Sequence, residues 1–159
     1  MKSIDFNLSD FLPYQLAVLT SRVSKVLSTT YEDRFGLSIP EWRVLVHVSQ
    51  CEKVSIREIH NCVNLEKPRV SRAVSKLVSN GLLDKTTNPH DQRLVEIKLT
   101  DEGLQVLQKI IPDALSFEAN LLGSFSESDV TQLFELMERL HAELDNHANA
   151  PKRSRLDTN

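Results

Sequence analysis

The sequence EKPRVSRAVSKLVSN, from Glu66 to Asn80, carries an apolar stripe and a basic stripe on one short segment. Its apolar residues recur at the spacing i, i+3, i+4 and i+7, which predicts an amphipathic helix of roughly four turns that ends at Asn80-Gly81. The apolar positions are Val70, Ala73, Val74 and Leu77. At 100° per residue, Arg69, Arg72 and Lys76 share the opposite stripe, with Ser71 on the flank. We therefore expect one side of this helix to pack in a core and the other to present cations.

A short helix and a tight turn are predicted directly before this segment. Ser55 opens the helix in a capping box, because its hydroxyl can accept a free backbone amide while Glu58 reaches back. The helix should run to about Cys62, and residues 61–65 form the turn. Farther upstream, Ser38-Ile39-Pro40-Glu41 is a second capping box that opens another helix. The expected inward face of that helix consists of Trp42, Leu45, Val46 and Ser49.

Two short strands are predicted directly after the basic helix. Residues 82–86 and 94–99 have strand-forming sequences, and the segment 88–91 between them is rich in turn residues. These strands should pair as a β-hairpin, or wing. A helix, a turn, a basic helix and a hairpin in this order are much more specific for a winged helix-turn-helix than a count of charges.

Long helices are predicted on both sides of this motif. The first ends near Gly36, a typical C-cap residue, and the last two begin at Thr100 and Ser126. The first and last helices carry apolar stripes longer than the small central core could cover, which predicts a homodimer. The alternative is that these helices only pack within one chain. The stripe residues are Leu16, Leu19, Val23, Val26 and Thr30 in the first helix, and Val130, Leu133, Phe134, Met137, Leu140 and Leu144 in the last.

The predicted fold is mainly α with a small β-hairpin wing, in which a winged helix-turn-helix domain lies between long N- and C-terminal dimerisation helices. The length of 159 residues fits one compact domain. We assign an N-terminal dimerisation helix to residues 1–36, the winged helix-turn-helix to 37–99, C-terminal dimerisation helices to 100–147 and a disordered basic tail to 148–159.

The charge of the chain is unevenly distributed. The formal net charge is −3, but residues 55–98 carry eight basic and five acidic residues, a balance of +3, while the remainder carries 11 and 17, a balance of −6. A basic central segment is typical of a nucleic-acid-binding domain.

No apolar run approaches the ~20 residues that span a bilayer, and the N-terminus does not resemble a secretory signal, so we expect a cytoplasmic protein without membrane contact. Cys51 and Cys62 lie inside helical patterns and do not indicate a disulfide framework.

Five short motifs follow one another between about Gly36 and Gly103. They are the entry FGLS at 35–38 with EWRVL at 41–45, the run RVSRAVSKL at 69–77, the exit GLL at 81–83, the wing HDQR at 90–93 and LTDEG at 99–103. In order and spacing they resemble the MarR (multiple antibiotic resistance regulator) family. Two residues depart from the family pattern: Pro68 replaces a small polar residue, and Leu94 follows Arg93 where Ser or Ala is common. Pro68 falls in the first helical turn, where it should not break the helix.

This resemblance implies a dimeric transcriptional repressor that reads an inverted repeat in double-stranded DNA. In that family the recognition helix enters the major groove, and the wing arginine, here Arg93, enters the adjacent minor groove. The wing aspartate, here Asp91, braces the loop by pairing with an arginine. The DNA-binding residues expected on this basis are Ser55, Lys67, Pro68, Arg69, Ser71, Arg72, Ser75, Lys76, His90, Asp91 and Arg93.

The resemblance also implies a small-molecule effector, often an aromatic or phenolic acid, between the dimer helices and the DNA-binding lobe. The residues able to line such a cleft are Phe11, Tyr14, Trp42, Arg43 and His47. Peroxide-sensing relatives have a reactive cysteine where this chain has Pro13. We expect no cofactor and no metal, although His47 and Cys51, with His60 nearby, keep a metal site open as a weaker alternative.

Two other classes of function remain as alternatives. An enzyme is disfavoured, because the sequence contains no P-loop, no dinucleotide-binding glycine pattern, no Gly-x-Ser-x-Gly and no metal-hydrolase pair of histidines. A winged helix used only for protein contacts is the more serious rival. Cations on both groove-facing elements favour DNA over a protein partner.

Overall fold

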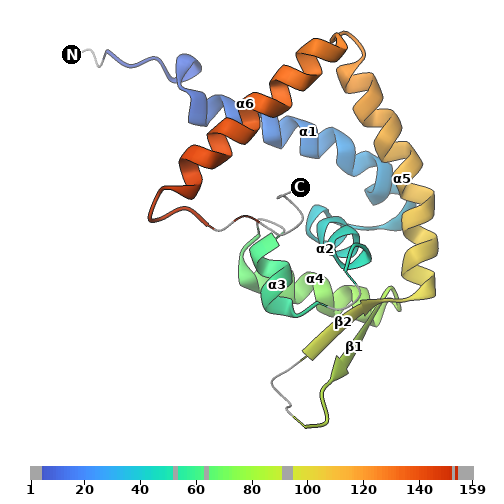
Figure 1. Cartoon of the computed structure of the whole chain (residues 1–159). Coiled ribbons are helices and arrows are strands. Elements are labelled where there is room, and N and C mark those ends of the chain that lie inside the picture. Colours follow the sequence, from blue (N-terminus) through green and yellow to red (C-terminus); the bar gives the residue numbers. More distant parts are fainter. Residues whose placement is uncertain (1–4, 52–53, 63–64, 91–94, 152, 154–159) are drawn as a thin grey trace.

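The computed structural model describes residues 5–51, 54–62, 65–90, 95–151 and 153 (Figure 1). Its elements are the 3-10 helix η1 (Leu8–Asp10), the helices α1 (Leu12–Phe35), α2 (Ile39–Ser49), α3 (Ile56–Cys62) and α4 (Lys67–Ser79), the strands β1 (Leu83–Thr87) and β2 (Val95–Leu99), and the helices α5 (Asp101–Leu122) and α6 (Glu127–Asp145). The predicted fold class, mainly helical with a two-stranded hairpin, is confirmed. The predicted wing residues Asp91 and Arg93 lie outside the described residues.

The molecule has a lobe formed by α2, α3, α4 and the hairpin. In Figure 1, α1 and α6 lie above this lobe and α5 rises along its right side. α2 lies at the centre of the lobe, where it contacts α1, α3, α4, α5 and β2. The most deeply buried aliphatic side chains around it are Leu37, Val44, Leu45, Val48, Ile59, Val70, Val74, Leu77, Leu83, Ile97, Leu107 and Ile110, each at most 1% exposed. Only the C-terminal part of α1 and the N-terminal half of α5 contribute buried residues to this core.

The helix α4 packs as its periodicity predicted. Its buried residues are Val70, Ala73, Val74 and Leu77. Gly81 follows the helix with φ of 73°, in the left-handed region that favours glycine. The Gly81 N–H donates to the Val78 carbonyl at 3.0 Å and the Leu82 N–H donates to the Leu77 carbonyl at 2.9 Å. The chain therefore satisfies two carbonyls at the end of α4 as it turns into the hairpin.

The strands β1 and β2 form the predicted antiparallel hairpin, with Leu83 opposite Leu99 and Thr87 opposite Val95. A third segment, which the sequence did not predict, joins this sheet. Val54 and Ile97 exchange two backbone hydrogen bonds, at 3.3 and 2.8 Å. A bridge of one residue has no periodicity that a sequence pattern could reveal. It fixes the start of α3 to the hairpin.

The inward face of α2 differs from the predicted one. The predicted face was Trp42, Leu45, Val46 and Ser49, whereas the buried residues are Glu41, Val44, Leu45, His47 and Val48. Ser49 is exposed and Trp42 is half-buried. The prediction was wrong because it assumed that α2 packs on one side, while the structure surrounds α2 with neighbours on several sides.

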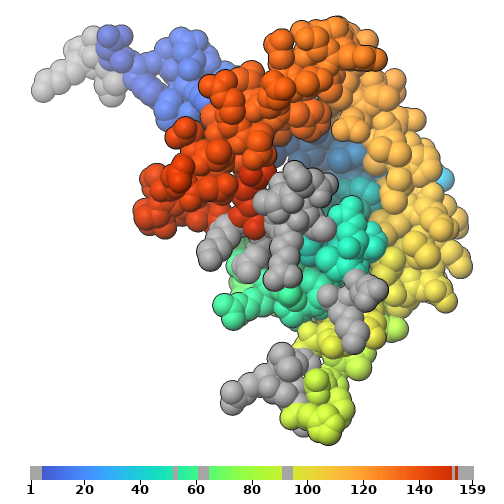
Figure 2. Space-filling view, in the orientation of Figure 1, coloured from blue at the N-terminus to red at the C-terminus, as the bar shows by residue number. Residues whose placement is uncertain are grey.

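The apolar stripes of α1 and α6 are largely exposed. None of the residues of α6 is buried, and five residues of its stripe are 40–55% exposed: Leu133, Phe134, Met137, Leu140 and Leu144. In α1, Leu16, Leu19 and Val26 are 43–56% exposed. Figure 2 shows α6 on the outside of the molecule. The alternative that both stripes pack within one chain is therefore wrong.

The chain beyond α6 returns to that helix at Arg153. The two terminal nitrogens of Arg153 donate to the Glu138 carboxylate at 2.7 and 2.8 Å, and this pairing lowers the pKa of Glu138. The predicted disorder of residues 148–159 stays a prediction, because residues 152 and 154–159 lie outside the described residues.

Among the helices that the structure describes, none is long and apolar enough to cross a membrane.

Gly103, at the start of α5, provides a test of how closely this helix packs against Leu82 and Leu99. A Cβ atom at this position would lie 2.2 Å from the Leu82 carbonyl oxygen and 2.8 Å from Leu99 Cδ1. We expect Gly103→Ala to lower the free energy of unfolding by about 1–3 kcal/mol, the usual cost of overpacking a core. Chemical denaturation measures this change. The matched control is Gly123→Ala, where the nearest atom would be 3.3 Å away; equal losses for both variants would contradict the close approach at Gly103.

Candidate nucleic-acid interface

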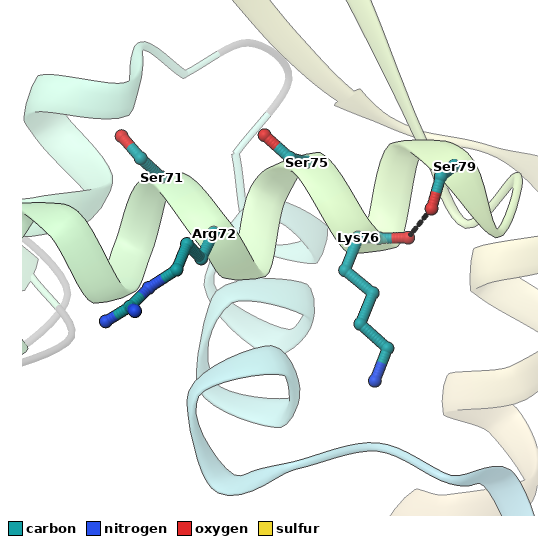
Figure 3. Close-up of a pocket in the computed structure, with 5 residues that line it drawn as sticks. All are labelled: Ser71, Arg72, Ser75, Lys76 and Ser79. Carbon is teal, nitrogen blue, oxygen red and sulfur yellow. Dashed lines mark hydrogen bonds between the residues drawn. The ribbon is translucent and has the colours of Figure 1, made fainter.

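The outward side of α4 has two chemically different edges. Arg69, Arg72 and Lys76 are exposed along one edge. Ser71, Ser75 and Ser79 follow the other at intervals of four residues, and Ser75 and Ser79 are exposed. Figure 3 shows Ser71 and Ser75 pointing to one side of the helix and Arg72 and Lys76 to the other. An open pocket along α4 offers hydroxyl groups and cations to the same ligand, and it is lined by Ser71, Arg72, Ser75, Lys76 and Ser79.

A second groove lies between α4 and the beginning of α2. We call it the cationic groove, and it is lined by Ser38, Pro40, Glu41, Arg69, Arg72, Ala73 and Lys76. Its formal charge is +2, because three cations face one carboxylate. The N-terminus of α2 adds the positive end of a helix dipole to the same place. Both features attract anions.

Glu41 is the acidic residue of the cationic groove and is only 5% exposed. Its carboxylate accepts the Ser38 N–H at 3.0 Å, and its own N–H donates to the Ser38 hydroxyl at 3.4 Å, so the predicted capping box is confirmed. The remaining carboxylate oxygen, Oε1, lies 3.3 Å from Lys76 Nζ. The pair between Glu41 and Lys76 joins α2 to α4 and was not predicted from the sequence.

The helix α3 is held in front of α4 by side-chain hydrogen bonds. At its start, the predicted capping box is present: the Ser55 N–H donates to Glu58 at 2.8 Å and the Glu58 N–H donates to the Ser55 hydroxyl at 3.2 Å. Toward its end, the Nδ1–H of His60 donates to the Leu65 carbonyl at 2.8 Å. This structural role of His60 was not predicted from the sequence. This bond joins the end of α3 to Leu65, two residues before α4 begins.

The start of α4 contains Pro68 in its first turn. The backbone N–H groups of Arg69 and Val70 both donate to the Glu66 carbonyl, at 2.9 and 3.1 Å, so the helix is unbroken as predicted. Lys67, Pro68 and Arg69 are exposed. Pro68 therefore presents an apolar ring, without an N–H donor, among the cations.

The hairpin projects beyond α4 (Figure 1). At its described end, the His90 N–H donates to the Asn88 side chain at 2.8 Å, which begins the predicted turn, and the His90 side chain is exposed. The pairing expected of Asp91 and the position of Arg93 lie outside the described residues.

The five residues expected to bind an effector do not all meet in one chain. Trp42 stacks on Tyr31 of α1 with ring centroids 5.0 Å apart, and Arg43 donates to the Ser24 hydroxyl at 3.4 Å. Burial raises the pKa of Tyr31, and the charge of Arg43 opposes this shift. His47 is buried at 7% exposure.

Phe11 and Tyr14 lie elsewhere on α1. Tyr14 is ten residues before Ser24, which corresponds to ~15 Å along the helix, and both aromatic residues are more than 40% exposed. Phe11 contacts Phe6 with ring centroids 5.4 Å apart. The structure thus brings Arg43 to the middle of α1 and Trp42 to its C-terminal part, and leaves Phe11 and Tyr14 near its start. Among the described residues, no three side chains of His, Cys, Asp or Glu form a group that could hold a metal ion.

Comparison with known proteins identifies the type of molecule. The family model described as "Transcriptional regulator SarA/Rot" matches residues 26–110, more than half of the chain. The HTH-type transcriptional repressor IacR of Pseudomonas putida is 24% identical over 136 residues, which cover 86% of this chain and 81% of that repressor.

Solved structures have the same fold. A MarR/EmrR family regulator from Acinetobacter sp. ADP1 has a TM-score of 0.79 and 28% identity, covering 88% of this chain and 99% of that one. Sco3205, a MarR family regulator from Streptomyces coelicolor solved in complex with DNA, has a TM-score of 0.78 and 19% identity, covering 94% and 97%. The chain therefore belongs to the SarA/Rot transcriptional regulators and to the wider MarR family of winged helix-turn-helix proteins that its motifs resemble.

Proposed function

We propose that this regulator is a dimeric repressor that reads an inverted repeat by inserting α4 into the major groove of duplex DNA and the wing into the adjacent minor groove. The observation that carries this proposal is the outward side of α4, where exposed cations and hydroxyl groups share one open surface. The residues proposed to contact DNA are Ser55, Lys67, Pro68, Arg69, Ser71, Arg72, Ser75, Lys76, His90, Asp91 and Arg93.

The two edges of α4 support different tasks within that surface. Serine hydroxyls both donate and accept, so Ser71 and Ser75 suit base edges or phosphates. Arg72 lies near the middle of the exposed side and has the fork of donors that matches guanine. Arg69 lies nearer the cationic groove, where the N-terminus of α2 adds positive potential, which suits a phosphate.

The proposed dimer rests on the exposed apolar stripes of α1 and α6. Contiguous exposed apolar side chains on a single chain mark sites of association. Both stripes repeat at alternating steps of three and four residues, the spacing of helices that pack against a partner helix. Pairing through these outer helices about a two-fold axis would present two copies of α4 to successive turns of one face of the duplex.

The proposed effector is a small aromatic acid that binds between α1 and α2. Trp42, which is half-buried and stacks on the buried Tyr31, supplies an apolar wall, and Arg43 supplies a cation within reach of α1. Phe11 and Tyr14 would complete this site only through the other subunit of the dimer. An effector there would bind between the dimer helices and the lobe that carries α4.

Replacement of Arg72 tests the groove assignment. We expect Arg72→Ala to weaken binding to an operator selected from random duplexes by about 1–3 kcal/mol and to relax discrimination at one base pair. Fluorescence anisotropy with the operator and its single-base variants measures both effects. The matched control is Arg139→Ala, an exposed arginine on α6. If Arg72→Ala binds like the control, α4 does not read DNA, and the protein-interaction alternative is favoured.

Replacement of Leu140 tests the dimer. Leu140 is 40% exposed on the α6 stripe, and a buried carboxylate there would lack a partner. We expect Leu140→Glu to give a monomer in size-exclusion chromatography with light scattering and to lose at least ~10-fold in operator affinity, because the two half-sites are no longer linked. Arg139→Glu, on the opposite side of α6, is expected to remain dimeric. A dimeric Leu140→Glu would remove α6 from the interface.

Replacement of Arg43 tests the effector site. An aromatic carboxylate that binds the folded protein raises its melting temperature by mass action. We expect a thermal-shift screen of benzoate-type acids to give at least one stabilising compound, and Arg43→Leu to abolish that stabilisation because the carboxylate loses its cation. Arg139→Leu should leave it intact. A stabilisation that survives Arg43→Leu would place the compound elsewhere.

A further inference from the structure

The pair between Glu41 and Lys76 occupies a place where a DNA-binding surface is expected to expose its cations. Lys76 lines both the open pocket on α4 and the cationic groove. Its side chain is 55% exposed, whereas that of Glu41 is 7% exposed. Figure 3 shows Lys76 directed away from the side of Ser71 and Ser75. Lys76 is thus an accessible cation with a buried carboxylate as its neighbour.

Glu41 is held in place by the backbone. Its Oε2 accepts the Ser38 N–H and its Oε1 faces Lys76 Nζ. A carboxylate with so little exposure is strongly destabilised when it has no partner. Glu41 Oε2 keeps the Ser38 N–H as its partner, but Oε1 would lose its cationic neighbour if Lys76 moved away. The loss of this attraction therefore favours the position of Lys76 next to Glu41 over an extended position in solvent.

We propose that Glu41 is a positioning residue that holds Lys76 against α2 and thereby weakens sequence-independent attraction to duplex DNA, so that the protein discriminates its operator better. This inference rests on the proposed function. Sequence-independent binding comes almost wholly from cations that neutralise phosphates and release counterions. Operator binding also uses contacts with base edges, which fix the register of α4 on the duplex. Lys76 is assigned here to phosphates of sequence-independent complexes, in which α4 has no fixed register, so holding Lys76 against α2 lowers non-specific affinity relative to operator affinity.

The charges of the groove support this assignment. With Glu41 ionised, the cationic groove carries +2, and without that charge it would carry +3. One additional neutralised phosphate steepens the slope of log K against log salt by about 0.9. By the same relation, the affinity contributed by one such contact is about threefold larger at ~50 mM salt than at physiological salt. Glu41 would therefore set the strength of background binding without touching a base.

The test is Glu41→Gln. The glutamine carbonyl oxygen still accepts the Ser38 N–H, so the cap is kept while the negative charge is removed. We expect binding to random-sequence duplexes to strengthen about threefold or more and its salt slope to steepen by about 0.9, while the ratio of operator to random affinity falls by a similar factor. Fluorescence anisotropy over a range of KCl concentrations measures these quantities.

The matched control is Asp129→Asn. Asp129 forms the same kind of capping box with Ser126 at the start of α6, away from α4. The control changes the net charge of the protein by the same amount. If Asp129→Asn steepens the slope as much as Glu41→Gln, the effect comes from bulk charge and the proposal is overturned. An unchanged slope in Glu41→Gln overturns it as well.

A second comparison serves if Glu41→Gln does not fold, as judged by circular dichroism. When Glu41 already neutralises Lys76, Lys76→Met should flatten the salt slope clearly less than Arg69→Met, which removes a proposed phosphate contact and should flatten it by about 0.9. Equal effects would show that Lys76 contacts phosphate as an independent cation, and the proposal would fail. Wild-type protein that selects no operator and binds no duplex would instead refute the proposed function, which separates the two failures.

Discussion

The surface of α4 depends on the burial of its apolar side in the lobe. A helix of 13 residues is marginal in water on its own. Val70, Val74 and Leu77 are at most 1% exposed, and each such side chain stabilises the folded state by roughly 1.5–3 kcal/mol relative to exposure. Only one rotation of α4 about its axis buries these apolar residues. The cations and hydroxyl groups on the other side of the helix therefore have a fixed direction. A rotation of α4 would exchange apolar residues with charged ones in the core.

The end of α4 is joined to the start of α5 by a compact set of hydrogen bonds. Thr100 Oγ1 donates to the Gly81 carbonyl at 2.7 Å and accepts the Gly103 N–H at 3.0 Å. The Thr100 N–H donates to the Leu82 carbonyl at 3.2 Å. The hairpin leaves and returns through this junction, so α4, the wing and α5 share one anchor. Since α5 leads to α6, a displacement of the outer helices has a direct covalent and hydrogen-bonded route to α4.

The sequence was a good guide wherever the structure is determined locally. The predicted capping boxes at Ser38 and Ser55 and the apolar repeat of α4 each depend on residues within a few positions of one another, and all are present. The inward face of α2 could not be predicted, because it depends on neighbours that arrive from distant parts of the chain. The Val54 bridge and the pair between Glu41 and Lys76 have the same origin. These three features depend on tertiary contacts between distant segments, which local sequence patterns do not contain.

The lobe and the outer helices carry net charges of opposite sign. Residues 55–98 carry a formal charge of +3 and the rest of the chain −6. A duplex is strongly negative, so it is attracted to the lobe and repelled by the outer helices, and the repulsion acts from outside the contact surface. The long-range field therefore orients the protein before any contact forms. Close to the DNA, where individual side chains decide affinity, the cationic groove becomes the dominant feature, and Glu41 is the acidic group within it.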